Sequence, residues 1–417
     1  MLIHSASQVV TLTETPQRGD ALGTLNIVPD GAVLVNGETI AEVGPSAELL
    51  RRYPNEEQLD AHGHAMIPGF VDPHTHLVWA GDRAAEFEMR LAGASYMEIM
   101  AAGGGIQSTV NATRAASPEE LLEQTRQHAE DIFRLGTTSA EAKTGYGLAL
   151  DSELKQLGVL LRLDAQGPLE IFPTFLGAHA IPKEYKENPD GYVDLVVSQM
   201  LPEVKDWWLA NAAGKPLPFV DVFCEDGAFS LIQSRRILER ARDLSFPLKI
   251  HADEFANLGG ASLAAELGAV SADHLVKTST EDIQALADSN TAAVSLPCTP
   301  FGLAEKEYSP AKALISAGAL FALASDLNPG TAWSGSMQFV IALASRMMRL
   351  TPAQALAAAT INAAAAVNQA ERLGSIHAGK QADLLILNVD DYRHLAYRFG
   401  VNLVDTVIKK GEVTPLS

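Results

Sequence analysis

Histidines and carboxylates in this chain follow directly after short apolar runs, and two of the histidines are one residue apart. The run that ends at Val71 leads into Asp72-Pro73-His74-Thr75-His76. Side chains two positions apart in an extended segment point to the same side, so His74 and His76 form half of a metal site. Together with His251 and Asp326, which follow later runs, they make a set of three imidazoles and one carboxylate. The alternative is that these histidines only form hydrogen bonds in a packed core.

Four more side chains lie where they could act on a substrate. His274 is either a fifth ligand or, as we prefer, a residue that hydrogen-bonds to the metal's water. Glu254 lies three residues past His251 and could exchange protons with the substrate, unless it is a surface carboxylate. Arg83 is a candidate anchor for a substrate carboxylate, unless it is a solvated surface arginine. Tyr146 could contact the substrate or serve only the turn in which it lies.

Other kinds of chemistry find less support in the sequence. The glycine run 103–105 does not match Gly-x-Gly-x-x-Gly and does not follow a strand, which disfavours nucleotide binding. A serine hydrolase is disfavoured because no Gly-x-Ser-x-Gly appears. The two cysteines, Cys224 and Cys298, permit one disulfide at most and are too few for a thiolate zinc site. A reducing cytosol is therefore the simplest compartment.

The elements that would position these residues recur through the middle of the chain. Eight apolar runs alternate with amphipathic segments, a pattern that predicts buried parallel strands joined by helices. Capping boxes with proline at the first helical position begin at Ser117 and Thr351. Eight such units predict an α/β fold, a (β/α)₈ barrel, whose chemistry lies at the carboxyl ends of the strands. The runs are Ala65–Val71, Thr137–Ala142, Leu169–Leu176, Phe219–Phe223, Pro247–Ile250, Ala269–Ala272, Ala292–Leu296 and Leu320–Ala324.

The two ends of the chain have a different, β-rich character. Gly31–Val35 and Thr39–Val43 flank Asn36-Gly37, which is a strong hairpin signal. Ala382–Leu387 and Val404–Ile408 are similar short segments near the other end. We therefore predict that residues 1–66 and 370–417 together form a small β-sandwich domain, and that residues 67–369 form the barrel.

Composition narrows the classes of partner. The 417 residues include 31 Lys and Arg against 51 Asp and Glu, a formal net charge of −20, which argues against nucleic acid and against a polybasic membrane surface. The longest uncharged stretch, Leu350–Ala370, is mostly alanine interrupted by polar residues, which predicts a buried helix and not a membrane span. The start of the chain lacks the pattern of a targeting segment. We expect a cytoplasmic protein that acts on a small molecule.

Several stretches resemble the amidohydrolase superfamily and, within it, the imidazolonepropionase family of histidine degradation. Pro68–His76 resembles the superfamily signature, and so does Leu373–Leu387, where the chain re-enters the β-sandwich. The likeness to the family covers essentially the whole chain. It rests on the stretches Ala80–Arg83, Ala102–Ile106, Lys143–Leu148, Phe175–His179, Phe223–Glu225, His251–Phe255 and Ser325–Thr331.

The resemblance implies one Zn²⁺ or Fe ion per chain, held by His74, His76, His251 and Asp326. Dinuclear relatives carry a carboxylated lysine where this chain has Cys224-Glu225, so one metal is favoured, with a bridging Glu225 left open. The resemblance also implies a homodimer. It implies substrate contacts from Arg83, Tyr146, His179, Glu254, Asn328, Gly330 and Thr331.

The implied reaction opens the ring of 4-imidazolone-5-propanoate to give N-formimidoyl-L-glutamate. Asp326 would take the proton of the attacking water, and His274 would hold that water or stabilise the oxyanion. Glu254 would protonate the departing nitrogen. Arg83 would hold the propionate, because a protein of net charge −20 needs a local cation for an anionic substrate.

Two rival functions remain at this point. An aminohydrolase of the same superfamily that acts on a purine or pyrimidine would use the same metal and the same base, so the ligands do not discriminate. Its neutral substrate would give Arg83 no carboxylate to hold. A scaffold without activity is disfavoured because every ligand position is filled.

Overall fold

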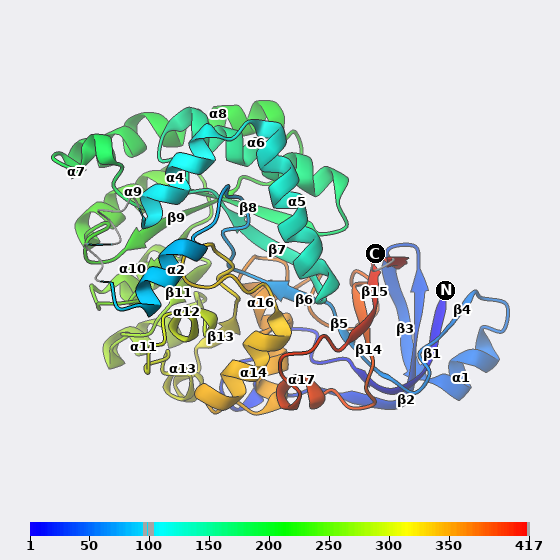
Figure 1. Ribbon diagram of the computed structural model, residues 1–417. Helices are drawn as coiled ribbons and strands as arrows, with labels where there is room; N and C mark the ends of the chain where they lie inside the picture. Colours follow the sequence, from blue (N-terminus) through cyan, green and yellow to red (C-terminus); the bar gives the residue numbers. More distant parts are fainter. Residues whose placement is uncertain (95–97, 99–103, 415–417) are drawn as a thin grey trace.

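A parallel sheet of eight strands holds the middle of the chain in this computed structural model, which describes residues 1–94, 98 and 104–414 (Figure 1). Ala102 and Gly103, the first two residues of the stretch Ala102–Ile106 on which the resemblance partly rests, lie outside the described residues. The strands pair in the order in which they occur along the chain, as the barrel prediction requires. They are β6 (Phe70–Asp72), β7 (Thr137–Lys143), β8 (Glu170–Ala178), β9 (Phe219–Cys224), β10 (Lys249–Ala252), β11 (Ser271–His274), β12 (Ala292–Ser295) and β13 (Leu320–Leu323).

The barrel closes where the segments that follow β6 and β13 meet. The Asp326 N–H donates to the His74 carbonyl at 3.1 Å, and the His76 N–H donates to the Leu327 carbonyl at 2.9 Å. These backbone bonds lie at the carboxyl ends of the strands, where the predicted ligands are. The prediction of a (β/α)₈ barrel is confirmed, and its seam is built from the ligand segments themselves.

Helices of the middle region surround the strands and begin at recognisable caps (Figure 1). Both predicted capping boxes are present, at Ser117 for α5 and at Thr351 for α15. The helices from residue 84 to residue 347 are α2 (Ala84–Leu91), α4 (Ile106–Ala115), α5 (Pro118–Arg134), α6 (Leu150–Gln166), α7 (Pro189–Leu195), α8 (Leu201–Asn211), α9 (Leu231–Asp243), α10 (Gly260–Leu267), α11 (Thr280–Ala287), α12 (Cys298–Gly302), α13 (Ala311–Ala317) and α14 (Met337–Met347).

The alanine-rich stretch predicted as one buried helix forms two short ones, α15 (Pro352–Ala358) and α16 (Ile361–Ala365). Thr360 between them has φ −131° and ψ −93°, outside the helical region. The break places the Asn362 amide 2.8 Å from the carbonyls of both Gln17 and Phe321. These bonds tie the end of the barrel to the N-terminal segment. Among the described residues, no helix has the length and apolar character needed to cross a membrane.

Both ends of the chain contribute to the second, largely antiparallel sheet, which contains the two termini in Figure 1. The predicted hairpin at Asn36-Gly37 is confirmed, and Gly37 adopts a positive φ of 56°. Apolar side chains from the two ends share one buried cluster, which includes Ile3, Val33, Leu384 and Ile408. The strands are β1 (Leu2–Val10), β2 (Ile27–Asn36), β3 (Thr39–Pro45), β4 (Gln58–Asp60), β5 (Ala65–Pro68), β14 (Leu384–Leu387), β15 (Val404–Lys409) and β16 (Glu412–Thr414), with helices α1 (Ser46–Arg52) and α17 (His394–Tyr397) beside them.

The run Ala65–Val71, predicted as a single barrel strand, is two strands in different sheets. β5 pairs with β1 and β14, whereas β6 pairs with β7. Gly69 separates them, and a Cβ at this position would lie 2.4 Å from the Thr138 hydroxyl oxygen. The prediction was wrong because apolar character shows that a run is buried but does not show which sheet it joins.

Candidate metal centre and active site

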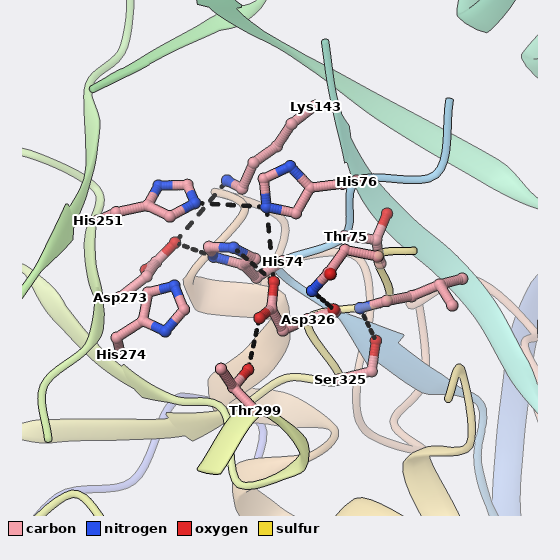
Figure 2. A network of polar contacts seen from close by, with 12 residues as sticks. His74, Thr75, His76, Lys143, His251, Asp273, His274, Thr299, Ser325 and Asp326 are labelled. Carbon is pink, nitrogen blue, oxygen red and sulfur yellow. Dashed lines mark hydrogen bonds and ion pairs between the residues drawn. The ribbon is translucent and has the colours of Figure 1, made fainter. Parts of the chain in front are cut away.

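Four predicted ligands converge at the barrel seam (Figure 2). Asp326 Oδ1 lies 3.4 Å from His74 Nε2 and 3.5 Å from His76 Nε2. The Nε2 atoms of His76 and His251 are 3.4 Å apart. All four side chains are buried. The structure thus brings together residues from three separate parts of the sequence.

The donor atoms fit one metal ion. Ligand atoms about 2.0–2.1 Å from a tetrahedral ion lie about 3.3–3.4 Å from one another, close to the observed separations of 3.4–3.5 Å. His74 Nε2 is buried without a hydrogen-bond partner. Burial also lowers the pKa values of His74 and His76 well below the usual range. Neutral imidazoles with free lone pairs in one cluster are the donor set that Zn²⁺ or Fe accepts.

Two buried carboxylates orient the imidazoles. Asp273 Oδ2 lies 2.7 Å from His74 Nδ1, and Asp221 Oδ2 lies 3.0 Å from His251 Nδ1. The His74 contact is a hydrogen bond, whereas the His251 contact is a close ion-pair distance without hydrogen-bond geometry. A carboxylate beside Nδ1 favours the proton there and leaves Nε2 free to bind a metal. Both Nε2 atoms therefore face the cluster as ligands would.

Asp326 is held in a fixed orientation. Its φ of 56° is unusual for a residue other than glycine, and it turns the side chain toward the two histidines after β6. The Thr299 hydroxyl donates to Oδ2, which leaves Oδ1 on the side of His74 and His76. Burial raises the pKa of the Asp326 carboxyl to about 6, and the Thr299 bond opposes that rise. A carboxyl of this kind can accept a proton near neutral pH.

His274 and Glu254 lie side by side at the edge of the cluster. His274 Nε2 is 3.7 Å from Glu254 Oε2. Burial, followed by the charges of Asp326 and Glu225, raises the pKa of Glu254 well above its usual range. A protonated Glu254 can donate a proton. His274 also forms a second group of possible ligands with His74 and His251, so both predicted roles of His274 stay open.

His179 and Tyr146 form one wall beside His76. The His179 ring stacks on that of His76 with centroids 4.8 Å apart, and Tyr146 lies edge-on to His179 at 5.3 Å. Burial lowers the pKa of His179 to about 3. Its Nδ1 lies 3.0 Å from the Gly145 carbonyl and must donate to it, so Nε2 of this neutral ring is a hydrogen-bond acceptor. Burial and the charge of Asp326 raise the pKa of the Tyr146 phenol.

Arg83 precedes α2 and already holds a carboxylate of the chain. Its Nε lies 2.9 Å from Glu86 Oε2, and its Nη2 also contacts the Glu86 carboxylate. Nη1 faces Gly330, where a Cβ would lie 2.2 Å from it. Only glycine at this position leaves room for the guanidinium. Arg83 and Gly330 also line a cavity of about 330 Å³ together with Phe87, Phe301 and Trp333.

Asn328, predicted to contact the substrate, is engaged in its own loop. Its Oδ1 accepts the N–H groups of Gly330 and Thr331, each at 2.8 Å. Its Nδ2 donates to the Asp326 carbonyl at 2.7 Å. These bonds fix the loop that follows Asp326, a supporting role that the sequence pattern did not indicate.

Glu225, which the sequence left open as a bridge to a second metal, is bound to backbone N–H groups. Its Oε1 accepts from Asp226 at 2.8 Å and its Oε2 accepts from Phe255 at 2.9 Å. It thereby ties the loop after β9 to the loop after β10. Cys224 and Cys298 are both free and buried.

Sequence reasoning missed the charged groups beneath the ligands. Three of the runs taken as apolar contain a charge that is fully buried, namely Glu141, Asp221 and Lys249. Asp72 is also buried and accepts the Ser325 N–H at 3.0 Å across the seam. Burial raises the pKa of Asp72 to about 7. A charge inside an otherwise apolar strand run was the signal that could have found three of these residues, because isolated buried charges are costly.

Residues 65–414 match the model of the amidohydrolase family, and residues 31–55 match that of the imidazolonepropionase-like composite domain of bacteria. The imidazolonepropionase of Herpetosiphon aurantiacus is 52% identical to this chain and aligns with 99% of it and 96% of its own length. The imidazolonepropionase of Chloroflexus aggregans is 49% identical to this chain, and the alignment covers 99% of this chain and 98% of the relative's own length.

Solved structures share the fold at low sequence identity. An adenosine deaminase from Xanthomonas campestris with bound zinc superposes with a TM-score of 0.72 at 21% identity, over 99% of this chain and 92% of its own. A 5-methylcytosine deaminase from Klebsiella pneumoniae superposes with a TM-score of 0.71 at 17% identity, and the match covers 99% of this chain and 97% of the deaminase. At this identity the likeness supports the barrel architecture alone.

Proposed function

The chain belongs to the amidohydrolase family and, within it, to the imidazolonepropionases, and on that basis we propose that His74, His76, His251 and Asp326 hold its single metal ion. The protein is a hydrolase of carbon–nitrogen bonds in cyclic amides and opens 4-imidazolone-5-propanoate to N-formimidoyl-L-glutamate. The observation that carries this function is identity of 43–52% to imidazolonepropionases across nearly the whole chain.

Asp326 is the proposed base. When bound, a metal ion supplies Lewis acidity that polarises a carbonyl and brings the pKa of water from 15.7 to about 7. The Asp326 carboxylate lies between the histidines and Thr299 and takes the proton of the attacking water. His274, next to Glu254, stabilises the developing oxyanion or holds that water.

Glu254 is the proposed acid that protonates the departing ring nitrogen. Its carboxyl is buried, and burial with the charges of Asp326 and Glu225 raises its pKa well above the usual range, which favours the protonated form. Burial raises the pKa of Asp326 to about 6, and the Thr299 hydroxyl bond opposes that rise, so this carboxyl can accept a proton. A carboxyl that favours its protonated form and a second one that can accept a proton suit one acid and one base.

Replacing Glu254 with glutamine is expected to lower kcat by about 10²-fold, because the amide cannot deliver a proton. Metal content should stay at the wild-type value, since Glu254 is not proposed as a ligand. Steady-state kinetics and metal analysis of the same preparation measure both. Loss of metal in the Gln variant would contradict the acid role and make Glu254 a support of the metal site.

Arg83 is the proposed anchor for the propionate of the substrate. An anionic substrate needs a local cation in a protein of net charge −20. Arg83 is paired with Glu86 through Nε and Nη2, so the propionate is proposed to share the guanidinium with Glu86 or to displace it. His179 offers an acceptor at Nε2, which suits an N–H of the substrate ring and does not suit its carboxylate. Tyr146, Asn328, Gly330 and Thr331 complete the proposed substrate contacts.

Arg83→Ala is expected to lower kcat/KM for 4-imidazolone-5-propanoate by about ten- to a hundredfold. Hydrogen bonds to charged groups are worth about 1.5–3 kcal/mol, and about 1.4 kcal/mol is a factor of ten. Arg83→Lys should recover only part of the loss, because lysine keeps the charge without the planar fork. An analogue with an amidated propionate should be a poor substrate that is indifferent to either change.

Arg372→Ala provides a matched control, since Arg372 also forms a fork with a glutamate, Glu170, but lies away from the metal cluster. It should leave kcat/KM near the wild-type value. An equal loss for the acid and for the amidated analogue in Arg83→Ala would show that Arg83 does not recognise the carboxylate.

A nucleobase aminohydrolase is the second candidate, since the barrel is shared with nucleoside and nucleobase deaminases. Assays of 4-imidazolone-5-propanoate, guanine and cytosine side by side test the function directly. Turnover of the first and neither of the others is expected. Turnover of a nucleobase alone would replace the proposed substrate.

We also propose that the protein is located in the cytoplasm and forms a homodimer. Free, buried cysteines agree with a reducing compartment. The dimer is carried over from the family resemblance.

A further inference from the structure

Lys143 lies fully buried at the carboxyl end of β7, among three carboxylates from three different strands. Its Nζ is 2.7 Å from Glu141 Oε1, 2.8 Å from Asp221 Oδ2 and 3.8 Å from Asp273 Oδ2. Each of these side chains has an exposed fraction of 0%. The ammonium group therefore balances negative charge that water cannot reach.

Two of these carboxylates hold metal ligands. Asp273 Oδ2, beside Lys143, is also 2.7 Å from His74 Nδ1. Asp221 Oδ2, which accepts from Lys143, is also 3.0 Å from His251 Nδ1. In both cases the same oxygen faces the lysine and the histidine. The position of the ammonium therefore helps to fix both carboxylate oxygens, and Figure 2 shows the one of Asp273 between Lys143 and His74.

The third carboxylate holds the backbone between the other pair of ligands. Glu141 Oε2 accepts the Thr75 N–H at 3.1 Å, while its Oε1 accepts from Lys143. Thr75 separates His74 from His76. The Lys143 N–H itself donates to the Thr75 carbonyl at 2.9 Å. Lys143 is thus linked to Thr75 twice, through its own backbone N–H and through the Glu141 carboxylate that its side chain binds.

From this arrangement we infer that Lys143 is a positioning residue that presets the metal centre through Asp221, Asp273 and Glu141. Lys249 Nζ also lies 3.8 Å from Asp273 Oδ2, but its printed hydrogen bonds go to the Pro73 and Ala366 carbonyls. Lys143 instead bonds directly to Glu141 and Asp221, so loss of its ammonium leaves these two carboxylates without their cation in a dry interior and loosens the partners of the two imidazoles. The inference rests on the proposed metal centre. It assigns to Lys143 a role that requires no contact with the substrate or the metal.

A lysine elsewhere in the chain provides the matched control. Lys409 is also buried and ion-paired, with Nζ 2.6 Å from Asp383 Oδ2 and 3.3 Å from Glu170 Oε2. It belongs to β15 in the other sheet. Lys409→Met removes a buried lysine from a carboxylate pair without touching the ligand supports. Any general cost of losing such a lysine appears in both variants.

Each variant is first loaded with Zn²⁺, and circular dichroism is used to check that it is folded. Its Zn²⁺ affinity is then measured by competition with a chromophoric chelator. Partners that orient metal ligands typically contribute about 10–100-fold in metal affinity. We expect Lys143→Met to bind Zn²⁺ at least about tenfold more weakly than both wild type and Lys409→Met. Lys143→Gln, which keeps one hydrogen-bond donor, should lie between Lys143→Met and wild type.

Equal Zn²⁺ affinity, within threefold, in Lys143→Met and Lys409→Met would overturn the inference. It would also be overturned if both Lys143 variants failed to fold while Lys409→Met folded, because the ammonium would then serve the fold as a whole. Failure of the wild-type protein to bind Zn²⁺ or Fe is a different result, which would overturn the proposed metal centre itself.

Discussion

Removal of the metal is expected to abolish ring opening. The amide bond is resonance-stabilised and water is a poor nucleophile at neutral pH, so the reaction depends on a Lewis acid worth several kcal/mol. At about 1.4 kcal/mol per factor of ten, the loss should be at least about a thousandfold. The purified protein should contain close to one Zn²⁺ or Fe per chain. Dialysis against a chelator, with metal analysis and assays before and after metal is added back, measures the effect.

Two histidine variants distinguish a specific loss of metal from a general loss of folded, active protein. His251→Ala should lower the metal content, because His251 Nε2 lies 3.4 Å from His76 Nε2 in the cluster. His377→Ala, in the segment where the chain returns to the β domain, should keep both metal and activity, since its Nε2 lies 3.3 Å from the Leu12 carbonyl and the ring is not part of the metal cluster. Full activity in protein shown to be metal-free would contradict the assignment.

Asp326→Asn is expected to lower kcat by about 10²–10⁴-fold, which is the usual contribution of general-base catalysis. The amide cannot take up the proton of the attacking water. If its nitrogen replaces Oδ2, the Thr299 hydroxyl also loses its acceptor. The measurement is kcat at saturating metal, with metal content and circular dichroism recorded on the same sample.

Asp282→Asn is a suitable control because Asp282 is a buried carboxylate that caps α11 away from the metal cluster. It should affect stability and leave kcat near wild type. A turnover of Asp326→Asn within threefold of wild type would show that Asp326 is not the base.

The convergence of the four proposed ligands was predictable from sequence because their positions depend on chain geometry that repeats. A strand alternates side chains, so His74 and His76 had to share a side. The carboxyl ends of parallel strands meet at one end of a barrel, so His251 and Asp326 had to approach them. The capping boxes at Ser117 and Thr351 depend on only four consecutive residues each.

The supports of the ligands were not predictable in the same way. Asp273 directly precedes His274 in the sequence, yet its carboxylate hydrogen-bonds to His74, which lies 199 residues earlier. Glu141 and Asp221 were absorbed into apolar runs because a single charge hardly changes the character of a run. Which carboxylate lies beside which imidazole depends on the register of the strands, and this register cannot be read from the sequence.

Loop roles were equally hidden. Asn328 could be placed near the substrate by its motif, but its bonds to Gly330 and Thr331 depend on the turn that follows the left-handed Asp326. The split of Ala65–Val71 at Gly69 likewise depends on Thr138 in another strand. Such features require the coordinates of partners that lie far away in sequence.

The seam between β6 and β13 has a consequence for synthesis of the protein. Asp72 and Ser325, which bond across it, are separated by 253 residues. Ribosomes add about 5–20 residues per second, so the β6 edge waits roughly 10–50 s for its partner. During that interval the edge is an unpaired strand of the kind that invites aggregation. The growing chain therefore passes through a stage in which His74 and His76 are made but Asp326 is not, and the complete proposed ligand set can assemble only after Asp326 has been synthesised.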